Sequence, residues 1–113
     1  MRSLPNTEEK RHRNYNNSNP PYFDPEWMAM LAMYGVSHFL TDLPSVDPEV
    51  DGGALKAHKA FWDYPEKPRM HATITELIYV PDSLPDGYYL LELNPAPIGT
   101  DAAPSNPVLY PRM

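Results

Sequence analysis

Proline limits what this chain can build more than any other residue type does. The sequence has 15 prolines among 113 residues, well above the usual share of about 5%. Because proline lacks a backbone N–H and its ring clashes with the preceding helical turn, it ends helices and interrupts interior strands. The sequence therefore predicts short helices and strands joined by extended segments, with room for one longer apolar element.

That longer element is the apolar stretch Asp24–Thr41. Asp24 can cap the first amides of a helix, Pro25 suits the first helical position, and Glu26 is favoured near the positive end of the helix dipole. We expect this helix to run to about residues 40–43, where Pro44 stops it. Its apolar residues surround the helix rather than forming one stripe, which predicts burial on several sides.

Three shorter elements are expected after this helix. The apolar spacing of Ala54–Tyr64 predicts a second helix. The alternating segment Met70–Val80 and the segment Tyr88–Leu93 read as strands. The turn residues between them predict an antiparallel hairpin over 70–93. Glu76 is an anomaly, because it lies on the otherwise apolar face of the first strand.

These elements predict an α+β fold, with a small core of two helices and an antiparallel β-hairpin. We expect a compact α+β unit over 24–94, flanked by extended proline-rich arms at 1–23 and 95–113. Units of this size have marginal stability on their own, and the chain has no cysteine for a disulfide. The long helix also has more apolar surface than the rest of the core can cover. Association with a protein partner, as a homo-oligomer or in a larger assembly, is therefore expected.

Charge and composition narrow the function classes. The net charge is −6, and no lysine or arginine occurs between residues 14 and 55, so nucleic acid is an unlikely partner. The longest apolar run is shorter than the roughly 20 residues of a membrane-spanning helix, and the first residues contain no apolar signal sequence. We expect a protein without a membrane span, located in the cytoplasm or within a virion.

One acidic segment resembles half of a calcium-binding loop. Asp47, Glu49 and Asp51 are spaced like the first three ligands of such a loop, and Gly52 follows them. His58 stands where the loop requires a glutamate. The three carboxylates are thus weak metal candidates, and the simpler interpretation is a solvated acidic turn before a helix. We expect neither a metal nor another cofactor.

Other titratable residues offer only loose constellations. A zinc site from His38, His58 and His71 would need the fold to bring them together, and the simpler interpretation of His38 is a core histidine with one hydrogen bond. Glu76 and Glu92 could face each other as an acid–base pair, but a sheet-edge position or a lysine partner is the simpler interpretation. No nucleophile motif or phosphate loop is present. We therefore expect a protein that is not an enzyme.

The remaining candidates are residues for binding a protein partner, because aromatic residues are enriched where proteins meet. They are Tyr15, Tyr22, Phe23, Trp27, Leu31, Tyr34, Val108, Leu109 and Tyr110. The preferred hypothesis is a structural or accessory subunit that docks into a larger assembly, such as a virion or a multisubunit complex. The alternatives are a small acidic inhibitor that blocks a partner's functional site, and a small enzyme of unknown type.

Overall fold

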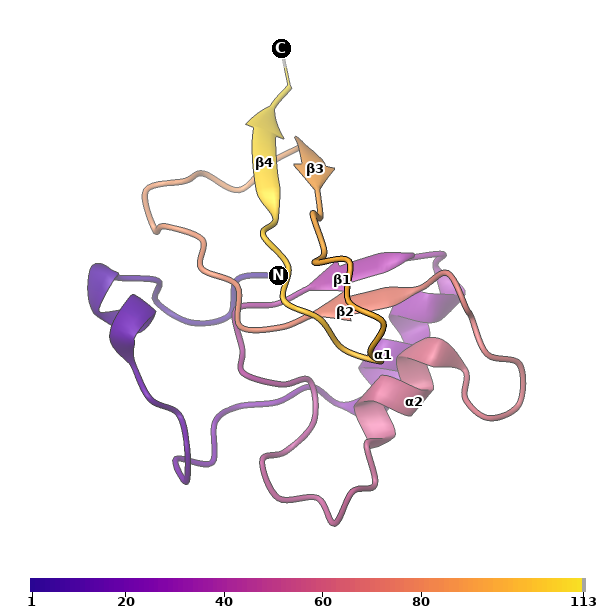
Figure 1. Cartoon of the computed structure of the whole chain (residues 1–113). Coiled ribbons are helices and arrows are strands. Elements are labelled where there is room, and N and C mark those ends of the chain that lie inside the picture. Colours follow the sequence, from indigo (N-terminus) through magenta and orange to yellow (C-terminus); the bar gives the residue numbers. More distant parts are fainter. Residues whose placement is uncertain (113) are drawn as a thin grey trace. The chain divides into compact units, whose positions relative to one another are not determined.

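The computed structural model describes residues 1–112 and confirms the α+β class (Figure 1). The elements in chain order are the 3₁₀ helix η1 (Glu8–His12), α1 (Pro25–Met33), β1 (His38–Leu40), α2 (Lys56–Trp62), β2 (Thr73–Thr75), β3 (Tyr89–Glu92) and β4 (Val108–Pro111). The chain divides into two compact units. We call Met1–Asp82 the large unit, and Ser83–Met113, described up to residue 112, the hairpin unit.

Helix α1 begins as predicted and ends earlier than predicted. The Asp24 carboxylate accepts a hydrogen bond from the Glu26 amide at 2.7 Å, and Pro25 is the first helical residue. The expected continuation to residues 40–43 is wrong, because the chain leaves the helix after Met33. Gly35 has a φ of +81°, in the left-handed region that commonly terminates helices. The residues after it are therefore free to form β1.

The strand pairing also differs from the predicted hairpin over 70–93. β2 pairs in parallel with β1, with Phe39 opposite Ile74. β3 pairs antiparallel with β4, with Leu91 opposite Leu109. The antiparallel hairpin is present, but its second strand comes from the segment that the sequence predicts as a C-terminal arm. Because α1 ends early, the residues after it form β1, and β1 pairs with β2. The sequence pattern did not predict this pairing.

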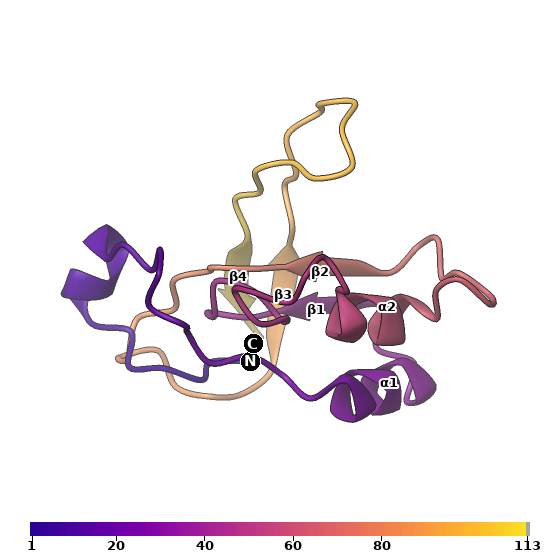
Figure 2. The ribbon, with the colours of Figure 1, turned by 90° about the horizontal axis from the view of Figure 1, so that it is seen from below.

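The core of the large unit lies where α1 and α2 pack against each other and against β1 (Figure 2). Phe39 of β1 is central, because its ring is 5.9 Å from that of Trp27 in α1 and 6.3 Å from that of Phe61 in α2. The buried hydrophobic residues are Met28, Phe39, Leu43, Val46, Ala57, Phe61 and Ala72. Phe23 stacks on Trp27 at 5.1 Å and extends this aromatic cluster.

The first residues of the chain are hydrogen-bonded into the large unit. The buried Asp42 carboxylate accepts from the amides of Ser3 and Leu4 at 2.7 and 2.8 Å. The Asn6 side chain also donates to Asp42 at 2.8 Å, and the Asn6 amide donates to Asp82 at 2.7 Å. These bonds hold the start of segment 1–23 against the strand ends of the large unit.

The hairpin unit has a different character. Neither β3 nor β4 contains a fully buried residue. Leu90 is 62% exposed, Leu91 is 40% exposed and Tyr110 is 46% exposed. A two-stranded hairpin with exposed apolar residues on both faces has no core of its own.

Candidate functional site

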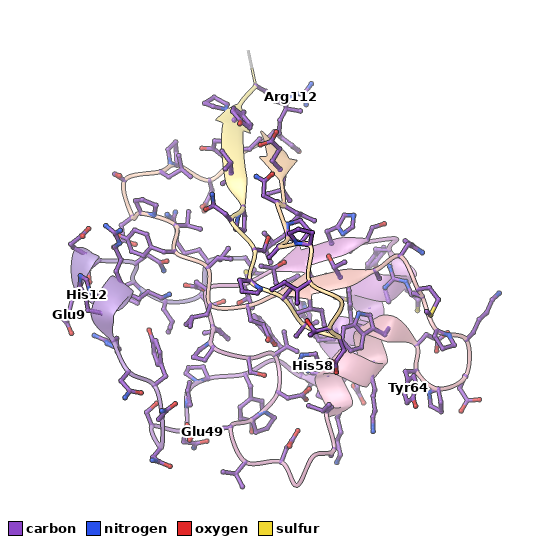
Figure 3. The ribbon with its side chains drawn as sticks, viewed as in Figure 1. Glu9, His12, Glu49, His58, Tyr64 and Arg112 are labelled. Carbon is purple, nitrogen blue, oxygen red and sulfur yellow. The ribbon has the colours of Figure 1, made fainter. Side chains whose placement is uncertain are left out.

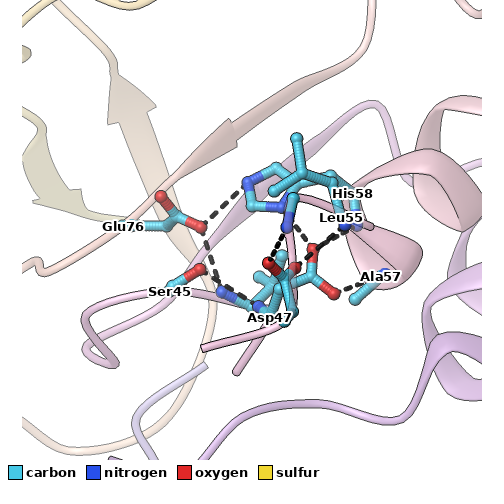
Figure 4. Close-up of polar contacts among 9 residues, drawn as sticks. Ser45, Asp47, Leu55, Ala57, His58 and Glu76 are labelled. Atoms are coloured by element: carbon cyan, nitrogen blue, oxygen red, sulfur yellow. Dashed lines mark hydrogen bonds and ion pairs between the residues drawn. The ribbon is translucent and has the colours of Figure 1, made fainter. Parts of the chain in front are cut away.

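The most connected group of titratable side chains is a cluster of Asp47, His58 and Glu76, called here the His58 cluster (Figure 4). His58 Nδ1 lies 2.6 Å from an Asp47 carboxylate oxygen, and His58 Nε2 lies 3.1 Å from Glu76 Oε1. The Asp47 side chain is only 3% exposed, that of His58 16% and that of Glu76 28%. An imidazole is thus held between two carboxylates near the surface of the large unit.

Backbone hydrogen bonds fix each member of the His58 cluster. The Asp47 carboxylate accepts from the amides of Ala57 and His58 at 2.7 and 3.1 Å, and so caps the start of α2. Glu76 follows β2 and accepts from the Val46 amide at 3.0 Å. The cluster therefore joins the loop before α2, α2 itself and the segment after β2. Glu76 therefore lies just past β2, which covers only Thr73–Thr75 of the predicted strand, and its carboxylate is used in these contacts.

The two carboxylates favour a positive charge on His58. Burial lowers the pKa of the imidazole, but its hydrogen bonds to Glu76 and Asp47 outweigh burial and raise the pKa above the ordinary value. For Asp47, burial raises the pKa, but the hydrogen bonds from Ala57 and His58 outweigh it and lower the pKa. When His58 is protonated, both of its ring nitrogens can donate, one to Asp47 and one to Glu76.

This arrangement suits structural work better than catalysis. A general base needs a free ring nitrogen that can take a proton from a bound substrate, and both nitrogens of His58 are engaged. Within residues 1–112, no group of three histidine or acidic side chains has the geometry to hold a metal ion.

The weak calcium candidates have separate surroundings. Asp47 belongs to the His58 cluster, and the Asp51 carboxylate accepts from the amides of Gly53 and Leu55 at 2.8 and 2.9 Å. Glu49 is exposed on the loop before α2, apart from His58 (Figure 3). The three carboxylates thus do not converge on one point.

Two other histidines lie at the surface. The expected core position of His38 is wrong, because its side chain is exposed and its Nδ1 lies 2.8 Å from Thr73 Oγ1. His71 is also exposed. Glu92 belongs to the hairpin unit, where its carboxylate accepts from the Tyr110 hydroxyl at 3.2 Å. Glu76 is thus hydrogen-bonded within the large unit and Glu92 within the hairpin unit. These hydrogen bonds do not pair the two carboxylates with each other.

The predicted partner-binding residues fall into three groups by burial. Phe23, Trp27 and Leu31 pack against the core of the large unit. Tyr22, Tyr34, Leu109 and Tyr110 are exposed, whereas Val108 is half-buried. Tyr15 is half-buried, and its hydroxyl has no hydrogen-bond partner within the described chain. The exposed group remains available for contact with another molecule.

Sequence reasoning missed two strongly exposed methionines. Met33 is 86% exposed and Met70 is 90% exposed. Met33 ends α1 three residues before Val36, and the Val36 carbonyl accepts from the guanidinium of Arg69, which precedes Met70. Leu90 and Leu91 were missed as well. Two consecutive leucines point to opposite faces of a strand. In a two-stranded hairpin, this pattern indicates that at least one of them is not buried in a core.

Enclosed space for a small ligand is scarce. Two open depressions of about 260 and 200 Å³ lie beside Tyr15, Pro20 and Pro21, below the roughly 300 Å³ at which ligand pockets usually begin. No helix in residues 1–112 combines the length and the apolar character needed to cross a membrane. Comparison with protein-family models, curated proteins and solved structures found no match to this chain.

Proposed function

We propose that this protein is a non-enzymatic accessory subunit that docks into a larger protein assembly through exposed apolar surfaces. The observation that carries the proposal is the hairpin unit, in which Leu90, Leu91, Leu109 and Tyr110 are all at least 39% exposed. An isolated two-stranded hairpin is marginally stable in water, and further strands or a packed helix are needed for stability. A partner that covers this hairpin would supply the missing layer.

A second apolar surface supports the same proposal. We call Met33, Tyr34 and Met70 the methionine surface, and their exposed fractions are 86%, 77% and 90%. Contiguous apolar side chains on a soluble protein commonly mark a protein interaction site. Methionine and tyrosine suit this role, because methionine adapts to irregular surfaces and tyrosine combines an apolar ring with a polar tip.

The His58 cluster fits a subunit rather than an enzyme. It fastens three segments of the large unit with buried and partly buried charge-assisted hydrogen bonds. The depression that Asp47 helps to line has a volume of about 200 Å³, which is below the usual size of a ligand pocket. The cluster thus fastens the large unit, which carries the methionine surface.

The test is the sedimentation of the tagged full-length chain in an extract of its source, followed by mass spectrometry of the co-sedimenting fraction. We expect the chain in a complex several times larger than 12.9 kDa. The double variant Met33→Gln with Met70→Gln should leave this complex. Val50→Gln is the matched control, because Val50 is 87% exposed outside the methionine surface.

A wild-type chain that sediments only as a monomer or a homodimer would contradict the proposal. A double variant that stays in the complex as fully as Val50→Gln does would exclude the methionine surface from docking and leave the hairpin unit as the docking surface.

A further inference from the structure

The register of β3 and β4 fixes which backbone groups face the outer edges of the hairpin. The Asn106 amide donates to the Asn94 carbonyl at 3.3 Å, and the Ala96 amide donates to the Pro104 carbonyl at 2.8 Å. In an antiparallel ladder, hydrogen-bonded and non-hydrogen-bonded pairs alternate. Over the register of β3 and β4, even-numbered residues bond to each other, and odd-numbered residues turn their N–H and C=O groups outward. The alternation is interrupted at Asn94, which has a φ of +49°, and the Leu93 carbonyl accepts from Ser105 Oγ instead of facing the outer edge.

The two outer edges are not equivalent. On the β4 side, the outward positions are Pro107, Leu109 and Pro111, and the two prolines have no N–H to offer. Proline at an edge is a common way to prevent further strand pairing. The β3 side, Tyr88–Asn94, contains no proline and a single charge, Glu92. Among residues 1–112, no third strand pairs with β3.

We propose that the outer edge of β3 pairs antiparallel with β3 of a second copy of this chain, with the two-fold axis at Leu91. The outward residues Tyr89, Leu91 and Leu93 are symmetric about this axis. Leu91 then lies opposite Leu91 of the second copy, and Tyr89 lies opposite Leu93. The Leu91 pair can exchange backbone hydrogen bonds in both directions. In each Tyr89–Leu93 pair, the Leu93 N–H can donate to the Tyr89 carbonyl, whereas the Leu93 carbonyl accepts from Ser105 of its own chain.

The side chains favour a second copy as the occupant. Leu109 and Leu91 lie on the same face of the hairpin, because they are directly paired. The two-fold axis extends this pair into an apolar row across four strands, which is enough for a stable sheet. Glu92 falls opposite Leu90 of the second copy, so no two carboxylates are directly opposed. The same patch contacts itself, as in other two-fold interfaces.

This inference deepens the proposed assembly role by naming one partner surface, and its test uses the purified chain, so that it can fail independently of the sedimentation experiment. Light scattering of the wild type should give a mass that rises with concentration to twice 12.9 kDa. Leu91→Pro removes an outward N–H without touching the β3–β4 ladder, and it should reduce the mass to that of one chain. Leu109→Pro is the matched control, because Leu109 is 39% exposed against 40% for Leu91, and it should remain dimeric.

A cysteine variant keeps the proposal testable if proline disturbs the hairpin. The chain has no cysteine, so Leu91→Cys introduces a single thiol. Directly paired residues across antiparallel strands are about 4.5–5.5 Å apart at Cα, within the range of a disulfide. Oxidation should convert Leu91→Cys, but not Leu109→Cys, into a covalent dimer. A wild type that is monomeric at every concentration, or equal cross-linking of the two variants, would overturn the proposal.

Discussion

At the residue scale, the charge of His58 decides how firmly three segments of the large unit are joined. A neutral imidazole has only one N–H, so it can donate to Asp47 or to Glu76 but not to both. The Asp47 contact is the shorter of the two, at 2.6 Å against 3.1 Å, and Asp47 also caps α2. Loss of the proton should therefore release Glu76 first.

The stability of the large unit should fall as the pH rises above neutrality. The pKa of His58 is raised in the folded state. Its contribution to the free energy of unfolding is therefore fully present below the unfolded-state pKa of about 6.5 and is lost as the pH rises through the folded-state value. At pH 5, His58→Gln should lower the free energy of unfolding by about 1–3 kcal/mol, and this loss should be smaller at pH 9. Urea unfolding followed by tryptophan fluorescence measures both.

His71→Gln is the control for this prediction, because His71 is exposed. It should leave the pH dependence of the wild type unchanged. A cost of His58→Gln that is constant from pH 5 to pH 9 would show that the proton on His58 does not stabilise the fold.

At the element scale, Gly35 decides where α1 ends and β1 can begin. Its φ of +81° is in the left-handed region, and a Cβ atom there would meet nothing within 4 Å. Gly35→Ala should therefore cost about 1 kcal/mol of unfolding free energy through backbone strain alone. Gly35→Asn should cost less, since asparagine tolerates this conformation. Alanine as stable as glycine in chemical denaturation would refute this account of the helix end.

Local sequence patterns predicted where helices and strands form better than they predicted which strands pair with each other. The start of α1 was predictable because Asp24 and Pro25 act on neighbouring amides. The end of α1 was not predictable, because the apolar run continues past Gly35, whereas the backbone at Gly35 leaves the helical conformation for the left-handed region. The parallel partner of β2 was missed because alternation identifies a strand face but not the strand beside it.

The candidate site was predictable only as an anomaly. Glu76 stood out on an apolar strand face, but nothing in the sequence linked it to His58 or Asp47. The sequence offered Asp47 only as a weak metal candidate in an acidic turn, whereas its oxygens accept hydrogen bonds from α2. Such pairings depend on tertiary folding, which residue spacing does not encode.

At the scale of the whole molecule, the two units differ in how they bury apolar surface. The large unit has a core built on Phe39 and Phe61, with a hydrogen-bonded start of the chain. The hairpin unit leaves its leucines exposed and has an open edge on β3. This contrast between a self-sufficient unit and an incomplete one is the basis of the proposed assembly role.

Amide hydrogen exchange on the purified full-length chain, diluted until it is monomeric, tests this central claim most directly. Amides of α1 and β1 should be protected, whereas those of β3 and β4 should exchange almost as fast as an unfolded chain, because no partner covers the hairpin. Added assembly partner or raised protein concentration should then protect the hairpin. Protection of β3 and β4 equal to that of α1 in the dilute monomer would contradict the account, since the hairpin would need no partner.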